Sequence, residues 1–231
     1  MSDLLSEIDE ALFHDRAAEI WRKYSHLIIS FILGIVLLTA VLSVYSSWES
    51  KKEQSQTGQL FSSLTGPEAG IEKLEVTAEN TDGIHRSLAY LNKSHQLIEN
   101  KKTQLAIKDL TKAGKISDQP QIWQGYSHLL KGYALLTLNP PETEQALKAL
   151  DPLLNNQQSP WRYHALLAAA LIAGEHQKNY KKALEHLAHV NAGGARVPQR
   201  LVETGRKLHH VYTIELNRAD GNLKKTIKEQ G

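Results

Sequence analysis

Apolar residues recur every three to four positions along most of the chain beyond residue 68, which is the spacing of one face of an α-helix. One motif occurs four times: a small residue, large apolar residues one and four positions later, and polar residues between them. Its copies begin at Gly70, Ala106, Ala146 and Ala183, at intervals of 36, 40 and 37 residues. No stretch shows the strict alternation of a β-strand. The pattern predicts an all-α domain built from recurring helix pairs.

A second motif recurs in step with the first. Trp123 and Trp161 lie 38 residues apart, and a proline stands shortly before each, where proline suits the start of a helix. Breaks at 139–141 and 174–179 then separate the two helices of a pair. Since one pair cannot cover its own apolar face, repeated pairs are expected to stack as an α-solenoid of about four pairs, with a C-terminal capping helix. The expected helices span 68–79, 84–100, 103–114, 120–138, 142–155, 160–174, 179–190 and 197–217.

The most hydrophobic segment lies near the N-terminus. Residues 27 to 45 are nineteen residues without a charge, and a helix of that length extends about 28 Å, close to the ~30 Å core of a bilayer. We therefore expect a transmembrane helix at residues 26–48. The residues expected to anchor it at the two interfaces are aromatic or basic: Trp21, Arg22, Lys23, Tyr24, Tyr45 and Trp48.

A cleavable export signal fits this segment less well. Such signals have an apolar run of about 7–15 residues after a short basic start, whereas residues 1–25 carry six acids and precede a longer run. The weak cleavage pattern at 41–43 is surrounded by large residues. Three basic residues before the span against two after it slightly favour an N-terminus on the inner side.

Charge and composition narrow the function further. Residues 1–25 have a net charge of −3 and residues 49–231 a net charge of +5, with no dense basic run, so a nucleic-acid partner is not expected. The chain has no cysteine, which excludes disulfides, thiolate metal sites and cysteine nucleophiles.

No sequence motif points to catalysis or to a cofactor. The chain lacks a glycine-rich phosphate loop, a Gly-x-Ser-x-Gly elbow and a His-Glu-x-x-His zinc motif. His186 with His189, and His209 with His210, could share a face, but no third ligand has a fixed position beside them. We therefore expect no enzyme activity, no small-molecule substrate, no metal and no cofactor.

The start of the chain carries a more specific resemblance. Residues 2–24 form an amphipathic pattern that ends in Trp-Arg-Lys-Tyr, and one span and a tetratricopeptide-like domain follow. This order resembles the ancillary subunits of the bacterial SecYEG translocon. The leader positions that match are Asp3, Glu7, Asp9, Asp15, Arg16, Ala17, Trp21, Lys23 and Tyr24, while Ser25 stands where that family has glycine.

The repeats themselves resemble the tetratricopeptide repeat as a class. A small residue follows each tryptophan by four positions (Ser127 and Ala165), alanine opens each second helix, and Tyr180 stands three positions before Ala183. The intervals are longer than the usual 34 residues, and the first two units match less well.

The resemblance implies a single-pass protein of the bacterial inner membrane with a cytoplasmic N-terminus and a periplasmic repeat domain. Its partners would be membrane lipid, the SecYEG translocon and a periplasmic chaperone, and its role would be that of an adaptor in the biogenesis of translocated or membrane proteins. A structural factor for envelope or cell-division complexes is the alternative. The expected segments are a cytoplasmic amphipathic leader helix (1–25), a transmembrane helix (26–48), a juxtamembrane helix or linker (49–67), the repeat domain (68–217) and a polar tail (218–231).

Two interpretations remain open for the residues that analogy assigns to binding. Gln124, His128, Lys131 and Arg162 would face a partner-binding groove, or they are ordinary solvated residues. The acidic leader likewise either lies on the membrane surface or binds a protein partner. Trp123 and Trp161 are expected to serve packing.

Overall fold

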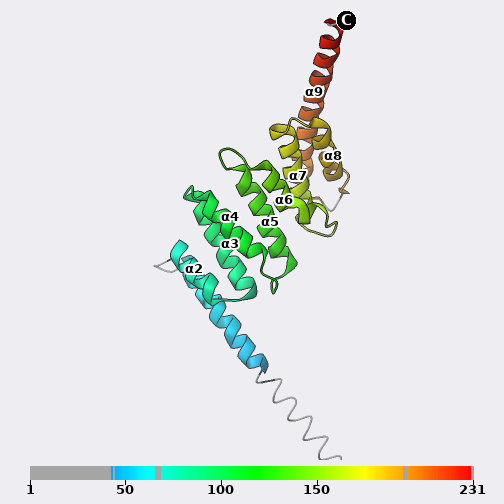
Figure 1. Ribbon diagram of the computed structural model, residues 1–231. Helices are drawn as coiled ribbons and strands as arrows, with labels where there is room; N and C mark the ends of the chain where they lie inside the picture. The colour runs from blue at the N-terminus through cyan, green and yellow to red at the C-terminus, as the bar shows by residue number, and fades with distance from the viewer. Residues whose placement is uncertain (1–42, 44, 66–68, 195–196, 230–231) are drawn as a thin grey trace, which may run out of the picture. The chain divides into compact units, whose positions relative to one another are not determined.

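The computed structural model describes residues 43, 45–65, 69–194 and 197–229, and this part of the chain is helical, with no β-strand (Figure 1). The all-α prediction is therefore confirmed. The chain divides into two compact units, Met1–Ser55 and Gln56–Gly231, and the packing described below belongs to the second.

The helix bounds agree closely with those expected from the hydrophobic pattern. The difference lies at the C-terminus, where the last helix continues well past 217, through residues that are mostly compatible with a helix. After a helical segment at 45–65, the elements are α2 (Ile71–Asn80), α3 (Gly83–Glu99), α4 (Thr103–Gly114), α5 (Gln121–Leu136), α6 (Thr143–Leu154), α7 (Arg162–Leu171), the π-helix η1 (Ile172–His176), α8 (Tyr180–Asn191) and α9 (Gln199–Glu229).

Each helix packs mainly against helices close to it in chain order (Figure 1). α3 lies against α2 and α4, α5 against α4 and α6, and α8 against α7 and α9. Helices two apart also meet, as α3 does with α5 and α5 with α7. Within the described residues, no extensive contact joins α2–α4 to α7–α9.

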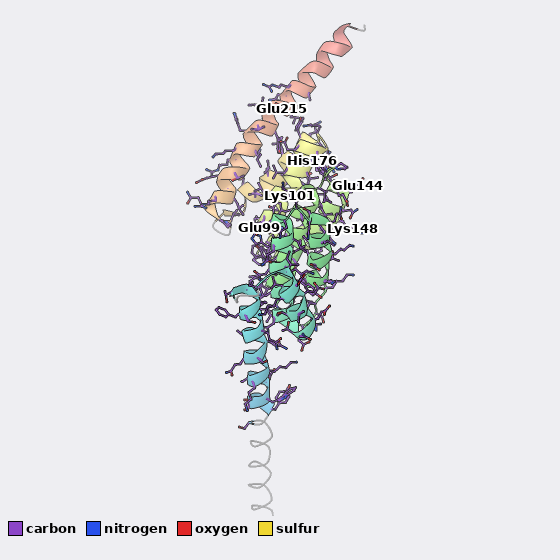
Figure 2. The ribbon with its side chains drawn as sticks, turned by 90° about the vertical axis from the view of Figure 1, so that its left-hand side faces the viewer. Glu99, Lys101, Glu144, Lys148, His176 and Glu215 are labelled. Carbon is purple, nitrogen blue, oxygen red and sulfur yellow. The ribbon has the colours of Figure 1, made fainter. Side chains whose placement is uncertain are left out.

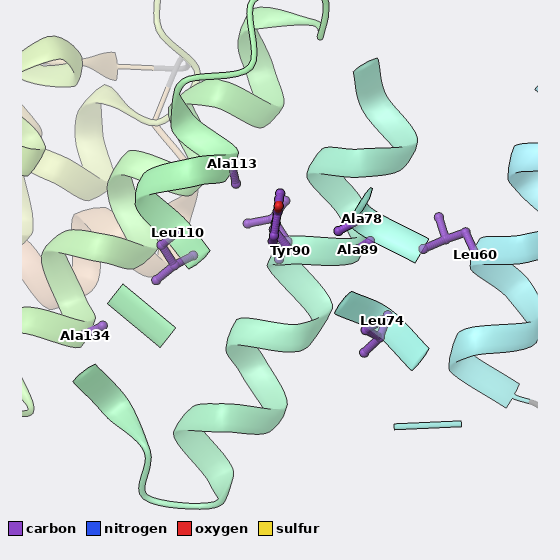
Figure 3. Packing of buried hydrophobic residues seen from close by; sticks show 9 residues of the cluster. Leu60, Leu74, Ala78, Ala89, Tyr90, Leu110, Ala113 and Ala134 are labelled. Carbon is purple, nitrogen blue, oxygen red and sulfur yellow. The ribbon is translucent and has the colours of Figure 1, made fainter. Parts of the chain in front are cut away.

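The recurring motif of the sequence supplies much of the core. Its alanines at 106, 146 and 183 are fully buried, and so are the leucines four positions later at 110, 150 and 187. A small residue lets the neighbouring helix approach closely, and the leucine one turn later fills the space beside it. In Figure 3, Tyr90 of α3 stands between Ala113 on one side and Ala78 and Ala89 on the other.

A network of charges around the buried Asp109 links α2, α3 and α4. The Lys93 ammonium of α3 pairs with Glu75 of α2 and lies 2.9 Å from Oδ2 of Asp109 on α4. Lys112 lies 3.6 Å from Glu75 and 3.8 Å from Asp109. Asp109 is almost completely buried, so its charge depends on these two ammonium groups.

The π-helix η1 makes room for a side chain of α9. Gly174 lies directly against the Tyr212 ring, where a Cβ atom would overlap ring carbons. The Tyr212 hydroxyl donates a hydrogen bond of 3.0 Å to Oε1 of Glu175. Burial, together with the Glu175 carboxylate, raises the pKa of Tyr212 above its usual value.

In the described part of the chain, no helix combines the length and the apolar character that a membrane span requires. The expected span at 26–48 falls outside the described residues except at 43 and 45–48, and the leader at 1–25 falls entirely outside them, with four of the six expected anchors: Trp21, Arg22, Lys23 and Tyr24. The other two anchors, Tyr45 and Trp48, are 60% and 63% exposed.

Candidate partner-binding surfaces on α5

Helix α5 is covered on two opposite sides and open on the two sides between them. Toward α4, Ala134 is buried in the cluster that contains Leu110. Toward α6, Gly132 lies so close to Leu150 that a Cβ atom would stand 2.7 Å from a leucine methyl carbon. These contacts fix the rotation of α5, and they leave one polar and one aromatic face for other molecules.

The polar face consists of Gln121, Gln124, His128 and Lys131, which recur at steps of three and four and so share one side of the helix. The first three line a hollow of about 240 Å³. Its opposite wall is the C-terminal end of α6 with the loop that follows: Pro152, Leu153, Asn156 and Ser159.

Side-chain contacts hold this face in place. Nε2 of Gln124 donates a 3.1 Å hydrogen bond to the carbonyl of Gly114, at the end of α4. The His128 ring lies against the same glycine, where an added Cβ would stand 3.5 Å from the ring. The hollow therefore lies between α5 and the end of α6, and contacts with the end of α4 hold Gln124 and His128 in place.

Two lysines from the flanking helices add charge to this face. Lys115 follows the last residue of α4, and Lys148 lies on α6. Burial lowers the pKa of Lys131, and the positive charges of Lys115 and Lys148 lower it further. Burial and then Lys131 lower the pKa of His128. We call the polar face of α5, with Lys115 and Lys148 beside it, the basic channel.

Three of the four residues assigned by analogy thus share one face, and Arg162 does not line the hollow with Gln124 and His128. Its Nε donates a 3.4 Å hydrogen bond to the carbonyl of Leu154, at the end of α6. In the sequence, Gln124 and Arg162 each directly follow a tryptophan. However, Trp123 lies inside α5, whereas Trp161 is the N-cap of α7, so the two positions differ in the structure.

The other open face of α5 is aromatic and apolar. Trp123, Tyr126 and Leu130 line a hollow of about 430 Å³ together with residues of α3: Leu88, Leu91, Asn92, Ser94, His95 and Ile98. We call it the aromatic hollow. Tyr126 also stacks on Trp161 with ring centroids 4.9 Å apart.

The two tryptophans pack as expected from the sequence. Trp123 lies against the cluster that contains Leu110, and Trp161 against the cluster that contains Leu150. Nε1 of Trp161 also donates a 2.7 Å hydrogen bond to the carbonyl of Ile122, which ties the start of α7 to α5. Both side chains therefore have a structural task, whatever else Trp123 contacts.

Sequence reasoning missed Lys115 and Lys148, because only the packing of three helices brings them to Lys131. It also missed the α3 wall of the aromatic hollow, whose residues belong to the ordinary apolar stripe of a helix. A further, larger hollow of about 540 Å³ opens between the α3–α4 turn and the end of α5, lined largely by turn residues. Among the residues with described side chains, no three histidine or carboxylate groups gather as a metal site would require.

The chain matches no protein-family model, and no curated protein and no solved structure matches it.

Proposed function

We propose that the protein is a membrane-anchored adaptor rather than an enzyme, held by residues 26–48 and presenting a tetratricopeptide-like α-solenoid to other proteins. The observation that carries the proposal is the nineteen-residue uncharged run, followed in the sequence by a helical domain whose hollows on α5 are open and of mixed polarity. Such surfaces suit polypeptide segments, which offer backbone polar groups and side chains of several kinds.

The proposed placement is the bacterial inner membrane, with the N-terminus in the cytoplasm and the repeat domain in the periplasm. The partners would be the SecYEG translocon and a periplasmic chaperone, and the task would be to assist translocated or membrane proteins. The resemblance of residues 2–24 to the leader of ancillary translocon subunits supports this placement, as does the small excess of basic residues before the span.

The mechanism would be tethering. A scaffold confined to the membrane meets translocon and emerging chain at a high effective concentration, so weak contacts are sufficient. Helices that pack mainly on their neighbours in chain order suit this role, because they offer a long surface relative to their number of residues.

Protease protection in intact membranes tests the placement. Protease added to intact inner-membrane vesicles with their cytoplasmic face outward should leave residues 49–231 uncleaved, and detergent should expose them. Retention of the chain in the membrane at alkaline pH is expected from an uncleaved span. Release by alkali, or cleavage of the domain in sealed vesicles, would contradict the anchor or its orientation.

Site-specific photo-crosslinking tests the partner. A photo-reactive residue at Ile122, which is 45% exposed on α5 and precedes Trp123 of the aromatic hollow, should crosslink to SecY or to a periplasmic folding factor. The same residue at Lys181, exposed on α8, is the matched control and should not. Crosslinks to division or cell-wall proteins instead would favour the structural assembly factor.

A further inference from the structure

We propose that the basic channel is a docking site for a short acidic peptide segment in extended conformation. Lys131 lies one turn after His128 on α5, and Lys148 lies one turn before Pro152 on α6. Lys115 directly follows Gly114, the α4 residue against which the His128 ring lies. Beside them lies a hollow whose polar lining includes Gln124 and His128. The inference rests on the proposed adaptor function, since it names the chemistry of a partner that this scaffold would hold.

The charges of the channel are not balanced inside the described structure. Among the described residues, no ion pair reaches Lys115, Lys131 or Lys148, whereas Lys93 and Lys112 both pair with carboxylates. Figure 2 labels Glu144 and Lys148, which lie one turn apart on α6. The ion pairs of the described residues include neither of them. Like charges held together in this way repel, and a carboxylate that enters between them removes the repulsion.

The folded chain supports this cluster through its own packing. The close approach of Gly132 to Leu150 sets α6 beside α5, next to Lys131, and the contact of Gly114 with His128 sets the end of α4 on the other side. Lys131 is half-buried while Lys115 and Lys148 are exposed, so the cluster has a recessed centre and two accessible sides. Core contacts therefore fix the backbone positions from which the three lysines extend.

The dimensions favour an extended peptide. Gln121 and Lys131 are ten residues apart on one helix face, a distance of about 15 Å. An extended chain covers that length with about four to five residues. The amide of Gln121 and the imidazole of His128 can bond to a peptide backbone, while the lysines attract its carboxylates.

A flat anionic membrane is the other occupant that lysines could attract, and the geometry favours it less. His128 lines the hollow between α5 and α6, and the Lys131 side chain beside it is half-buried. A lipid surface would reach only the exposed lysines at the two sides.

Peptide binding to the purified full-length chain in a non-ionic detergent tests the proposal. The probe is a fluorescent ten-residue peptide of alternating glutamate and serine. The control peptide has glutamine in place of glutamate. The glutamate peptide should bind at least about tenfold more tightly, and its affinity should fall as salt is raised from 50 to 300 mM.

The variant Lys115→Gln/Lys131→Gln/Lys148→Gln should weaken binding of the glutamate peptide by about tenfold or more, since each exposed ion pair contributes a few-fold to affinity. The control Lys108→Gln/Lys181→Gln/Lys207→Gln removes the same charge at exposed positions elsewhere and should change binding less than about twofold. If the channel variant folds poorly, Lys115→Gln/Lys148→Gln replaces only exposed side chains and should give an intermediate loss.

Equal binding of the glutamate and glutamine peptides would overturn the proposal, as would equal losses in the channel and control variants. Channel-dependent binding to phosphatidylglycerol vesicles without binding of the peptide would also overturn it, in favour of a membrane surface. Because these measurements use the purified chain, they are independent of sidedness. A failure here leaves the membrane placement standing, and a failure of protease protection leaves peptide binding intact.

Discussion

At the scale of single residues, the clearest constraint is the absence of a side chain at 174. The ring of Tyr212 occupies the place that a Cβ atom would need, and the π-helical turn of η1 sets Gly174 against that ring. π-helical turns often lie at sites where a helix departs from regular geometry for a structural or functional reason. Here the reason is the packing of Tyr212 of α9 against the turn.

Gly174→Ala should lower the free energy of unfolding by about 1–3 kcal/mol, because the added methyl group must displace a packed ring. Urea unfolding followed by circular dichroism measures the effect. Gly58→Ala is the matched control: Gly58 is also helical, and a Cβ there meets nothing within 4 Å. It should stabilise the chain by up to about 1 kcal/mol, through helix propensity alone. Equal effects of the two substitutions would contradict this account of Gly174.

The sequence indicates Gly174 only as part of a break between helices. It gives no sign that the break is a π-helical turn or that Tyr212 fills it, since the two residues are distant in the chain. Sequence patterns reveal positions that recur with a helical period. A close approach between two segments that are distant in the chain leaves no such periodic signal.

At the scale of elements, the ion network of Lys93, Glu75, Asp109 and Lys112 joins α2, α3 and α4. Oδ2 of Asp109 lies 2.9 Å from the Lys93 ammonium and accepts no hydrogen bond from the described part of the chain. Removing one partner of such a buried pair leaves the other charge without compensation.

Lys93→Met should therefore destabilise the protein by about 3 kcal/mol, with some compensation from Lys112, which stays within 4 Å of Asp109. The double variant Lys93→Met/Asp109→Leu should recover much of that loss, because it removes both charges together. Thermal and urea unfolding of the wild type, the two single variants and the double variant give the coupling energy. A double variant as unstable as the sum of the singles would show that the two residues act independently.

The elements also show where prediction from the sequence succeeds and where it stops. The positions of α2 to α8 follow from apolar periodicity and from prolines and glycines at their ends, which are local features. The shared face of Gln124, His128 and Lys131 follows from their spacing on α5. Arg162 is placed differently, because equal offsets from two tryptophans do not correspond to equal positions in α5 and α7.

At the scale of the whole molecule, the described helices of Gln56–Gly231 depend on their neighbours in chain order and little on helices further away. The repeat intervals of the sequence lead to this expectation. Which helices form the other walls of the basic channel and the aromatic hollow can be found only from the structure. A chain packed in this way is expected to open locally rather than all at once.

Leu187→Ala, in the core shared by α8 and α9, should cost about 2–5 kcal/mol locally. Native-state hydrogen exchange should then show faster exchange in α7, α8 and α9, while the amides of α2, α3 and α4 keep their protection. The reciprocal variant Leu74→Ala, in the cluster at the other end, should give the opposite distribution. Uniform loss of protection in both variants would instead indicate a single cooperative unit.

Helix α5 is shared between two surfaces. Within sixteen residues, the side chains that line the basic channel alternate with those that line the aromatic hollow. A one-residue insertion inside α5 would turn the rest of the helix by about 100° and misplace both sets together. An insertion or deletion in this stretch should therefore disturb both surfaces, and a ligand that shifts α5 at one surface should also change the other.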